Sequence, residues 1–196
     1  MKIFLPLYFL LFFSLAMVLP SYRIWRANGV NPYKLGASDS AHDYIGRVFR
    51  LIMLACLLVV ILFALSPDAY LYLLPISFLT NQALAVIGLV LLLTALTWVL
   101  IAQAHMQKSW RIGIDQDVRT DLVQTGLFKI SRNPIFLGMR LMLLGLFMII
   151  PSAMTLSILV AGELVTQIQV RLEEEFLTRT HGESYQAYQK RVRRWI

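Results

Sequence analysis

Residues 134–170 decide the fold; they read PIFLGMRLMLLGLFMIIPSAMTLSILVAGELVTQIQV. Two apolar runs, residues 134–150 and 153–170, are separated only by Pro151 and Ser152. A membrane-spanning helix needs roughly 20 mostly apolar residues, and a proline interrupts helical hydrogen bonding. Helices joined by so short a connection are antiparallel neighbours. The stretch therefore predicts a helical hairpin that crosses a membrane.

Three more apolar runs precede the hairpin, at residues 3–19, 48–65 and 82–104. The first is not followed by a small-x-small cleavage pattern, so we expect a membrane helix and not a signal peptide. A shorter apolar stretch, residues 70–79, is interrupted by Pro75 and is expected at the membrane interface. With 58% apolar residues and a mean hydropathy of +0.67, the 196-residue chain is too apolar for an ordinary soluble domain.

These runs predict an all-α integral membrane helical bundle of about five transmembrane helices. We expect one membrane domain, residues 1–196, because no Gly/Ser linker or internal repeat divides the sequence. Three spans would lie in residues 1–103 and the more polar half in residues 104–196. The tail, residues 171–196, is expected to form an amphipathic helix.

Positive charge is concentrated in three segments between and after the spans. Sixteen of the eighteen Lys and Arg fall in residues 20–50, 104–133 and 171–196, which five spans would place on one side of the membrane. Because Lys and Arg are enriched on the cytoplasmic side, the net charge of +7 indicates topology and not a nucleic-acid partner. We therefore expect a cytoplasmic C-terminus, and the compact length without a retrieval signal favours a bacterial inner membrane.

Two charged residues lie inside the hairpin. Arg140 is 11 residues before Pro151 and Glu163 is 11 residues after Ser152. At about 1.5 Å per residue, both lie roughly 16 Å from the turn, so the two side chains can meet. The pair is either a structural lock for the hairpin or part of the lining of a polar cavity.

The segment before the hairpin carries residues with special backbone or charge properties. Gly126 can adopt a conformation closed to other residues, and Pro134 suits the first position of a helix. Arg132 and Asn133 would then lie at a helix N-terminus, which favours anionic groups. A basic loop at the membrane interface explains the same composition, and both interpretations stay open.

The tail carries carboxylates and aromatic rings. Three consecutive glutamates, 173–175, are suited to binding a cation or to pairing with Arg132, although acidic residues in a first helical turn are also ordinary dipole complementation. Tyr185 and Tyr188 would share a helical face suited to lipid headgroups. His105 and His181 lack ligand spacing, so no metal site is expected, and the lone Cys56 is expected in the core.

Three sequence elements, in order, resemble a known family. They are Leu122-Val123-x-x-Gly126-x-Phe128, Arg132-x-Pro134-x-Phe136-x-Gly138, and Glu173-Glu174 followed by Gly182-x-x-Tyr185-x-x-Tyr188. Over residues 104–194 they resemble the isoprenylcysteine carboxyl methyltransferases and their bacterial and phospholipid-methylating relatives.

The resemblance implies a membrane methyltransferase that binds S-adenosylmethionine near the cytoplasmic face and takes a lipophilic small-molecule or lipid acceptor from the bilayer. The sequence lacks the glycine-rich turn of a Rossmann domain, which agrees. The implied cofactor-binding residues are Thr120, Asp121, Leu122, Val123, Gly126, Phe128, Asn133, Pro134, Ile135, Phe136 and Glu173. Gln169 and Arg171 are expected near the acceptor, and Arg132 and Glu174 are expected to be catalytic, with Glu174 as the base for an amine acceptor.

The chain departs from the family pattern at three positions. Asn133 and Thr120 stand where the family has histidines, so neither can act as a base. Gln169 replaces an arginine that the family uses near its substrate, which argues against a prenylcysteine acceptor and leaves carboxylate, thiol and amine acceptors open. A related membrane protein that does not methylate, such as a reductase-like or accessory protein, and a purely structural protein are the competing hypotheses.

Overall fold

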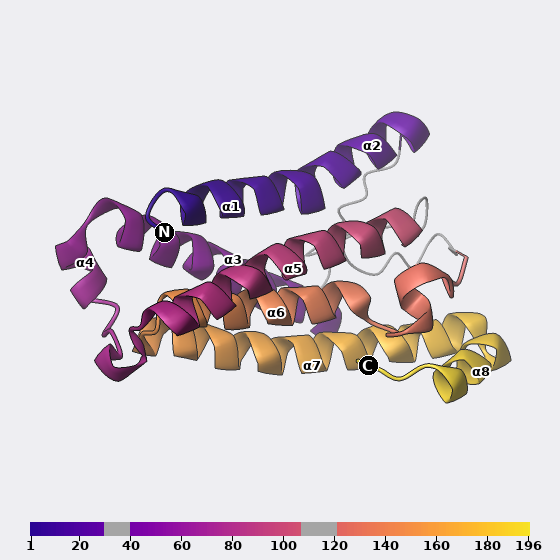
Figure 1. Ribbon diagram of the computed structural model, residues 1–196. Helices are drawn as coiled ribbons and strands as arrows, with labels where there is room; N and C mark the ends of the chain where they lie inside the picture. The colour runs from indigo at the N-terminus through magenta and orange to yellow at the C-terminus, as the bar shows by residue number, and fades with distance from the viewer. Residues whose placement is uncertain (30–39, 107–120) are drawn as a thin grey trace.

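The computed structural model describes residues 1–29, 40–106 and 121–196, and within these ranges the regular elements are helices (Figure 1). Among the predicted site residues, Thr120 lies outside the described residues. The helices are α1 (Phe4–Phe13), α2 (Leu19–Asn28), α3 (Ala41–Leu65), α4 (Pro67–Leu71), α5 (Gln82–Met106), α6 (Pro134–Ile149), α7 (Ala153–His181) and α8 (Glu183–Arg191).

Four helical segments in the described ranges are long and apolar enough to cross a membrane: Phe4–Arg26, Ala41–Leu65, Gln82–Met106 and Ala153–His181. The fifth predicted span is the shorter apolar helix α6. Its 16 residues extend about 24 Å at 1.5 Å per residue, less than the roughly 30 Å of a bilayer core. The structure therefore supports an all-helical membrane protein with four candidate spans.

The first span is one continuous helix with a π-helical turn, Ser14–Val18, between α1 and α2. Pro20 has no N–H, so the carbonyl of Ala16, four residues earlier, lacks its usual helical donor. Gln103 of α5 supplies a replacement: its Nε2 donates to Ala16 O at 2.6 Å. Tyr8 of α1 likewise donates to Leu92 O of α5 at 2.8 Å. These two bonds tie the first span to α5.

α6 and α7 form the predicted antiparallel hairpin. Ser152 caps α7, because its Oγ accepts from Thr155 N at 3.2 Å while Thr155 Oγ1 accepts from Ser152 N at 3.1 Å. The predicted interfacial stretch lies against this turn, with Ile76 N donating to Pro151 O at 2.8 Å. The predicted helical hairpin is confirmed, and residues 73–76 pair with its turn through backbone hydrogen bonds.

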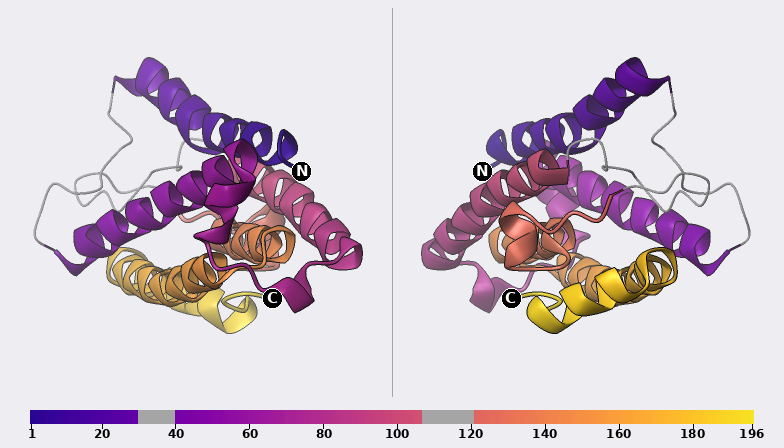
Figure 2. Two further views of the ribbon diagram at one scale, coloured as in Figure 1. Left: turned by 90° about the vertical axis from the view of Figure 1, so that its left-hand side faces the viewer. Right: turned by 90° about the vertical axis from the view of Figure 1, so that its right-hand side faces the viewer.

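α6 lies in the interior of the bundle, between α5 and α7, while α3 packs against α7 (Figure 2). Two glycines let α5 and α6 approach closely: a Cβ on Gly88 would lie 2.7 Å from Gly145 O, and one on Gly145 would lie 2.9 Å from Gly88 O. Small residues at such positions allow tight helix packing in membranes. At one end of the bundle lie α2, the end of α5, the start of α6 and α8; at the other lies α4 (Figure 1). We call the first the α8 end.

The tail differs in part from the prediction. α7 continues beyond the apolar run to His181, and the chain turns at Gly182 into α8. Tyr185 and Tyr188 share a face, with ring centroids 5.9 Å apart, but are only 1% and 2% exposed. Their predicted place among lipid headgroups was wrong, because both rings pack against the protein.

Candidate functional site

A buried carboxylate, Glu174, is the centre of a polar cluster at the α8 end of the bundle. It is 5% exposed and accepts hydrogen bonds from three side chains. Arg132 donates from Nε at 3.1 Å and from Nη2 at 3.0 Å to Oε1, and Asn133 Nδ2 donates to the same oxygen at 3.1 Å. Arg194 donates from Nη2 to Oε2 at 2.8 Å. Two guanidinium groups and an amide thus hold one carboxylate, and the predicted pairing of Arg132 with the glutamates is confirmed at Glu174.

The last residues of the chain complete this cluster. We call residues 192–196 the C-terminal strap. Arg132 donates from Nη1 to Val192 O at 2.6 Å, and from its backbone N to Arg193 O at 3.0 Å. Ser131 Oγ donates to Arg194 O at 3.2 Å. The strap therefore runs along residues 131–133 and fixes the chain that leads into α6.

α8 holds the neighbouring loop in the same way. Tyr188 OH donates to Phe128 O at 2.6 Å, and burial raises the pKa of Tyr188 to about 12, which keeps the phenol protonated as a donor. Arg194 donates a hydrogen bond to Glu174, and this bond raises the pKa of Arg194 above its usual value. The Arg194 guanidinium therefore stays charged. Both groups therefore keep the protonation state that their contacts require.

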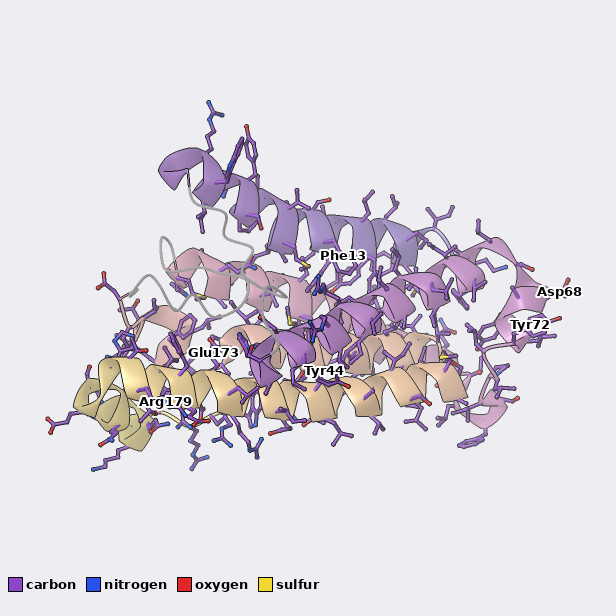
Figure 3. The ribbon with its side chains drawn as sticks, turned by 180° about the vertical axis from the view of Figure 1, so that it is seen from behind. Phe13, Tyr44, Asp68, Tyr72, Glu173 and Arg179 are labelled. Atoms are coloured by element: carbon purple, nitrogen blue, oxygen red, sulfur yellow. The ribbon has the colours of Figure 1, made fainter. Side chains whose placement is uncertain are left out.

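Glu173 and Glu174 are adjacent in sequence but differ in environment. Glu173 is partly buried and has no side-chain hydrogen-bond partner among the residues that the structure describes. Figure 3 shows it on α7 beside the first turns of α3, where Tyr44 lies. Glu175 is exposed and pairs with Arg179 one helical turn later. Of the three consecutive glutamates, Glu173 is thus the partly buried one that has no side-chain hydrogen-bond partner in the described ranges.

Gly126 is one of the predicted cofactor-lining residues before α6. Gly126 has φ +59°, and a Cβ there would lie 2.3 Å from the His105 ring, so only glycine fits. His105 accepts from Leu127 N at 3.3 Å, which gives this histidine a structural role. The described residues contain no group of side chains that could hold a metal ion.

The predicted cofactor-binding residues before and at the start of α6 differ in burial. Pro134 is the first residue of the helix, and Trp98 Nε1 donates to its carbonyl at 3.0 Å. Phe128, Asn133 and Pro134 are buried, Leu122, Val123, Ile135 and Phe136 are partly buried, and Asp121 is exposed.

The two residues predicted near the acceptor lie on different faces of α7. Gln169 is buried, and its Nε2 lies 3.1 Å from His42 Nδ1 of α3. Arg171 is exposed and donates to Gln167 O at 2.7 Å. Residues two positions apart on a helix do not face the same side, so only Gln169 points into the bundle.

The predicted contact inside the hairpin is confirmed. Arg140 Nε lies 2.6 Å from Glu163 Oε2, and Gln167 Nε2 donates to Glu163 Oε1 at 2.8 Å. The indole ring of Trp195 in the strap covers the Arg140 guanidinium, with the ring centroid 4.3 Å from Cζ, within the range of a cation–π interaction. The strap therefore contacts both the Glu174 cluster and the hairpin ion pair.

A family model described as phospholipid methyltransferase matches residues 83–184, about half of the chain. The chain belongs to this family of membrane methyltransferases. The matched residues run from α5 to the beginning of α8 and include every glutamate of the run 173–175. No curated protein and no solved structure matches the chain.

In this member of the phospholipid methyltransferase family, two residues of the site were not predicted from the sequence. Arg194 lies in the strap beyond the matched residues, and His42 lies in α3 before them. Nothing local marks either residue, since one is among several basic residues of the tail and the other is a lone histidine. Both positions depend on contacts between distant segments.

Proposed function

We propose that the protein transfers a methyl group from S-adenosylmethionine to a lipophilic or lipid acceptor, and that the cofactor binds at the α8 end of the bundle. Family membership supports the reaction class. The structure supports the location, because the residues that resemble the family's cofactor motifs, in residues 121–136 and in α7, lie at the α8 end of the bundle.

The contrast between Glu173 and Glu174 carries the proposal. Glu174 accepts hydrogen bonds from Arg132, Asn133 and Arg194. Glu173 has no side-chain hydrogen-bond partner among the described residues, so its carboxylate is the one we assign to a ligand. A partly buried carboxylate suits the ammonium group of the cofactor's methionine portion. Each of the two adjacent glutamates thus has a separate role.

The remaining residues fit the other parts of the cofactor. The first-turn amides of α6 favour a carboxylate, and Phe128, Ile135 and Phe136 provide apolar and aromatic surface suited to adenine. The cofactor supplies an activated methyl group; the protein's residues bind it, orient it toward the acceptor and exclude water. Of the predicted cofactor residues, Asp121 is exposed and therefore contributes at the rim.

Arg132 and Glu174 are assigned positioning roles in this proposal. A carboxylate that accepts from two guanidinium groups is a poor base, because protonation would sacrifice those charge-assisted bonds. Their contacts hold residues 131–133 against α7, which sets the direction of the α6 N-terminus.

We also propose a membrane topology, based on the distribution of positive charge. α6 would act as a fifth, short span, α8 would lie at the cytoplasmic face, and the protein would reside in a bacterial inner membrane. The segments rich in Lys and Arg that the structure describes, in α2, before α6 and in α8, share the α8 end (Figure 1). This common end supports a cytoplasmic C-terminus.

Calorimetric titration of S-adenosylmethionine into the detergent-purified protein tests the proposal. We expect micromolar binding that is weakened about tenfold or more in Glu173→Gln, since each tenfold change corresponds to about 1.4 kcal/mol. Glu175→Gln is the matched control, because that carboxylate is exposed and pairs only with Arg179 among the described residues. Absence of binding to folded wild-type protein would reject the methyltransferase assignment and favour a relative without this cofactor.

A further inference from the structure

Large apolar side chains are exposed at the end of the bundle opposite the Glu174 cluster, from the last residue of α4 toward α5 (Figure 1). We call residues 71–79 the apolar loop and this end of the bundle the α4 end. Four residues of the loop are between 62% and 84% exposed: Leu71, Tyr72, Leu74 and Phe78. Neighbouring apolar side chains left exposed in this way mark a surface that binds protein or lipid. The apolar loop therefore contacts something outside the folded chain.

The backbone of the apolar loop is fixed against the hairpin turn. Ile76 N donates to Pro151 O at 2.8 Å. Ala153 N donates to Leu74 O at 2.9 Å. Between the exposed residues, the side chain of Leu73 is buried in the core. The exposed side chains therefore extend from a backbone that the bundle holds in place.

Leu74 has a disfavoured backbone conformation within this loop. Its φ is +56°, and it is the one residue other than glycine with a positive φ in the described ranges. A residue with a Cβ is destabilised there, because the Cβ lies too close to the following carbonyl oxygen. Packing within the chain does not offset this, since the Leu74 side chain is mainly exposed. A strained conformation that leaves a leucine outside the core indicates a contact beyond the chain.

The composition of the α4 end favours lipid over a protein partner. Between positions 51 and 107, Asp68 is the one Asp, Glu, Lys or Arg. Protein interfaces surround their apolar centre with a polar rim, and these residues supply little of one. The exposed apolar surface continues onto α3, where Leu58, Ile61 and Leu65 are exposed. Because α3 is a candidate membrane span, the same acyl chains can cover both surfaces.

The length of α6 places this surface at the edge of the hydrocarbon core. α6 extends about 24 Å, roughly 6 Å less than the thickness of a bilayer core. α4 and the apolar loop extend beyond the hairpin turn at which α6 ends (Figure 1). Their exposed apolar side chains supply the apolar surface that α6 lacks. The edge of the hydrocarbon core therefore lies at the apolar loop and not at the hairpin turn.

We propose that the apolar loop anchors the bundle in the lipid leaflet at the α4 end, with Leu74 and Phe78 among the acyl chains. Figure 3 shows Asp68 and Tyr72 together at the tip of α4, and we assign both to the head groups, where tyrosine is enriched. An anchor at one end fixes the bundle along the membrane normal, which sets the depth of the α6 N-terminus near the opposite face. The anchor does not depend on the proposed methyl transfer.

A single nitroxide spin label measures the depth of the loop. Cys56→Ala removes the one native thiol, and the label is attached at Phe78→Cys in vesicles of dioleoylphosphatidylcholine. Leu54→Cys, exposed on α3, is the lipid-facing reference, and Asp68→Cys is the aqueous reference. We expect the ratio of collisions with oxygen to collisions with a water-soluble nickel chelate to be about tenfold higher at Phe78 than at Asp68, because the bilayer core excludes polar solutes.

Two results of this measurement overturn the proposal. One is a Phe78 label that the nickel chelate reaches as readily as the label at Asp68, which would place the loop in water. The other is a Phe78 label that neither reagent reaches, which would place a protein or a second copy of the chain on the loop.

Bilayer thickness provides a second readout. A residue at the edge of the hydrocarbon core responds to thickness, whereas a residue in the middle of a span does not. In thinner vesicles of dimyristoleoylphosphatidylcholine, the Phe78 label should become severalfold more accessible to the nickel chelate, while the Leu54 label should stay protected. Equal protection of the Phe78 label in thin and thick bilayers would place it away from the edge and overturn the proposed depth.

Leu74→Asn separates a role in anchoring from a role in folding. Asparagine adopts positive φ more readily than leucine, so the melting temperature in detergent should stay unchanged or rise. In dioleoylphosphatidylcholine vesicles, the Phe78 label should become about threefold or more accessible to the nickel chelate, because the loop loses an inserted apolar side chain. Ile196→Asn, exposed in the strap, is the control and should leave the Phe78 label unchanged. A lower melting temperature with unchanged accessibility would make Leu74 structural and overturn its assignment.

Discussion

Arg194 and Glu174, separated by 20 positions, are joined by three hydrogen bonds: Arg194 Nε lies 3.2 Å from each carboxylate oxygen and Nη2 lies 2.8 Å from Oε2. The same carboxylate binds Arg132, which precedes α6. The end of the chain is thereby connected to the beginning of the hairpin through a single buried glutamate.

Arg194→Gln should lower the free energy of unfolding by about 1–3 kcal/mol, because it leaves a buried carboxylate with fewer charged donors. Thermal unfolding in detergent measures the loss. Arg193→Gln is the matched control, since the Arg193 side chain is exposed and only its carbonyl bonds to Arg132. Equal melting temperatures for the two variants would contradict the role of Arg194.

Gly126→Ala should destabilise the protein more than Gly29→Ala. Both glycines have positive φ, for which any residue with a Cβ loses about 1–2 kcal/mol, but only at Gly126 would the Cβ also collide with His105. The added Cβ at Gly29 has nothing within 4 Å. Comparison of the two melting temperatures isolates the collision, and adding His105→Ala to Gly126→Ala should recover part of the loss.

Glu163→Ala should cost about 2–3 kcal/mol, because it leaves Arg140 unpaired within an apolar helix. The double variant Arg140→Met with Glu163→Leu should return close to wild-type stability, since it removes both charges. Denaturation in mixed detergent micelles gives the stabilities. Wild-type cofactor binding in this double variant would identify the pair as a structural lock, whereas lost binding would identify it as the lining of a polar cavity.

Gln103→Leu should cost about 1–2 kcal/mol, because the Ala16 carbonyl loses its only side-chain donor among the described residues. Pro20→Ala provides a backbone N–H four residues after Ala16, and should therefore offset part of this loss in the double variant. A double-variant cycle followed by thermal unfolding measures the coupling. Additive effects would mean that Gln103 and Pro20 act independently.

Much of the fold was predictable because a bilayer imposes simple length and polarity requirements on each helix. The hairpin followed from two apolar runs and Pro151-Ser152, and the contact between Arg140 and Glu163 followed from counting residues on either side of that turn. The motifs before α6 and in the tail indicated the methyltransferase family, which the match to residues 83–184 confirms. These features depend on order and spacing within short segments.

The roles of individual polar residues were less predictable. Three consecutive glutamates look alike in sequence, but Glu174 is buried among donors, Glu175 is exposed, and Glu173 is left without a side-chain partner in the described chain. Successive residues on a helix point about 100° apart, so the packing of neighbouring helices decides which of them is buried. The same packing turned Tyr185 and Tyr188 inward.

The sequence by itself determined that this protein is a helical membrane protein with the motifs of a membrane methyltransferase. Only the tertiary structure decided that Arg194 completes the Glu174 cluster and that His42 meets Gln169, at a separation of 127 positions. Apolar length and helical periodicity are local properties, and they are fixed once the solvent is a bilayer. Contacts between distant segments depend on the rotation and axial offset of packed helices, which the summed packing of the whole bundle sets.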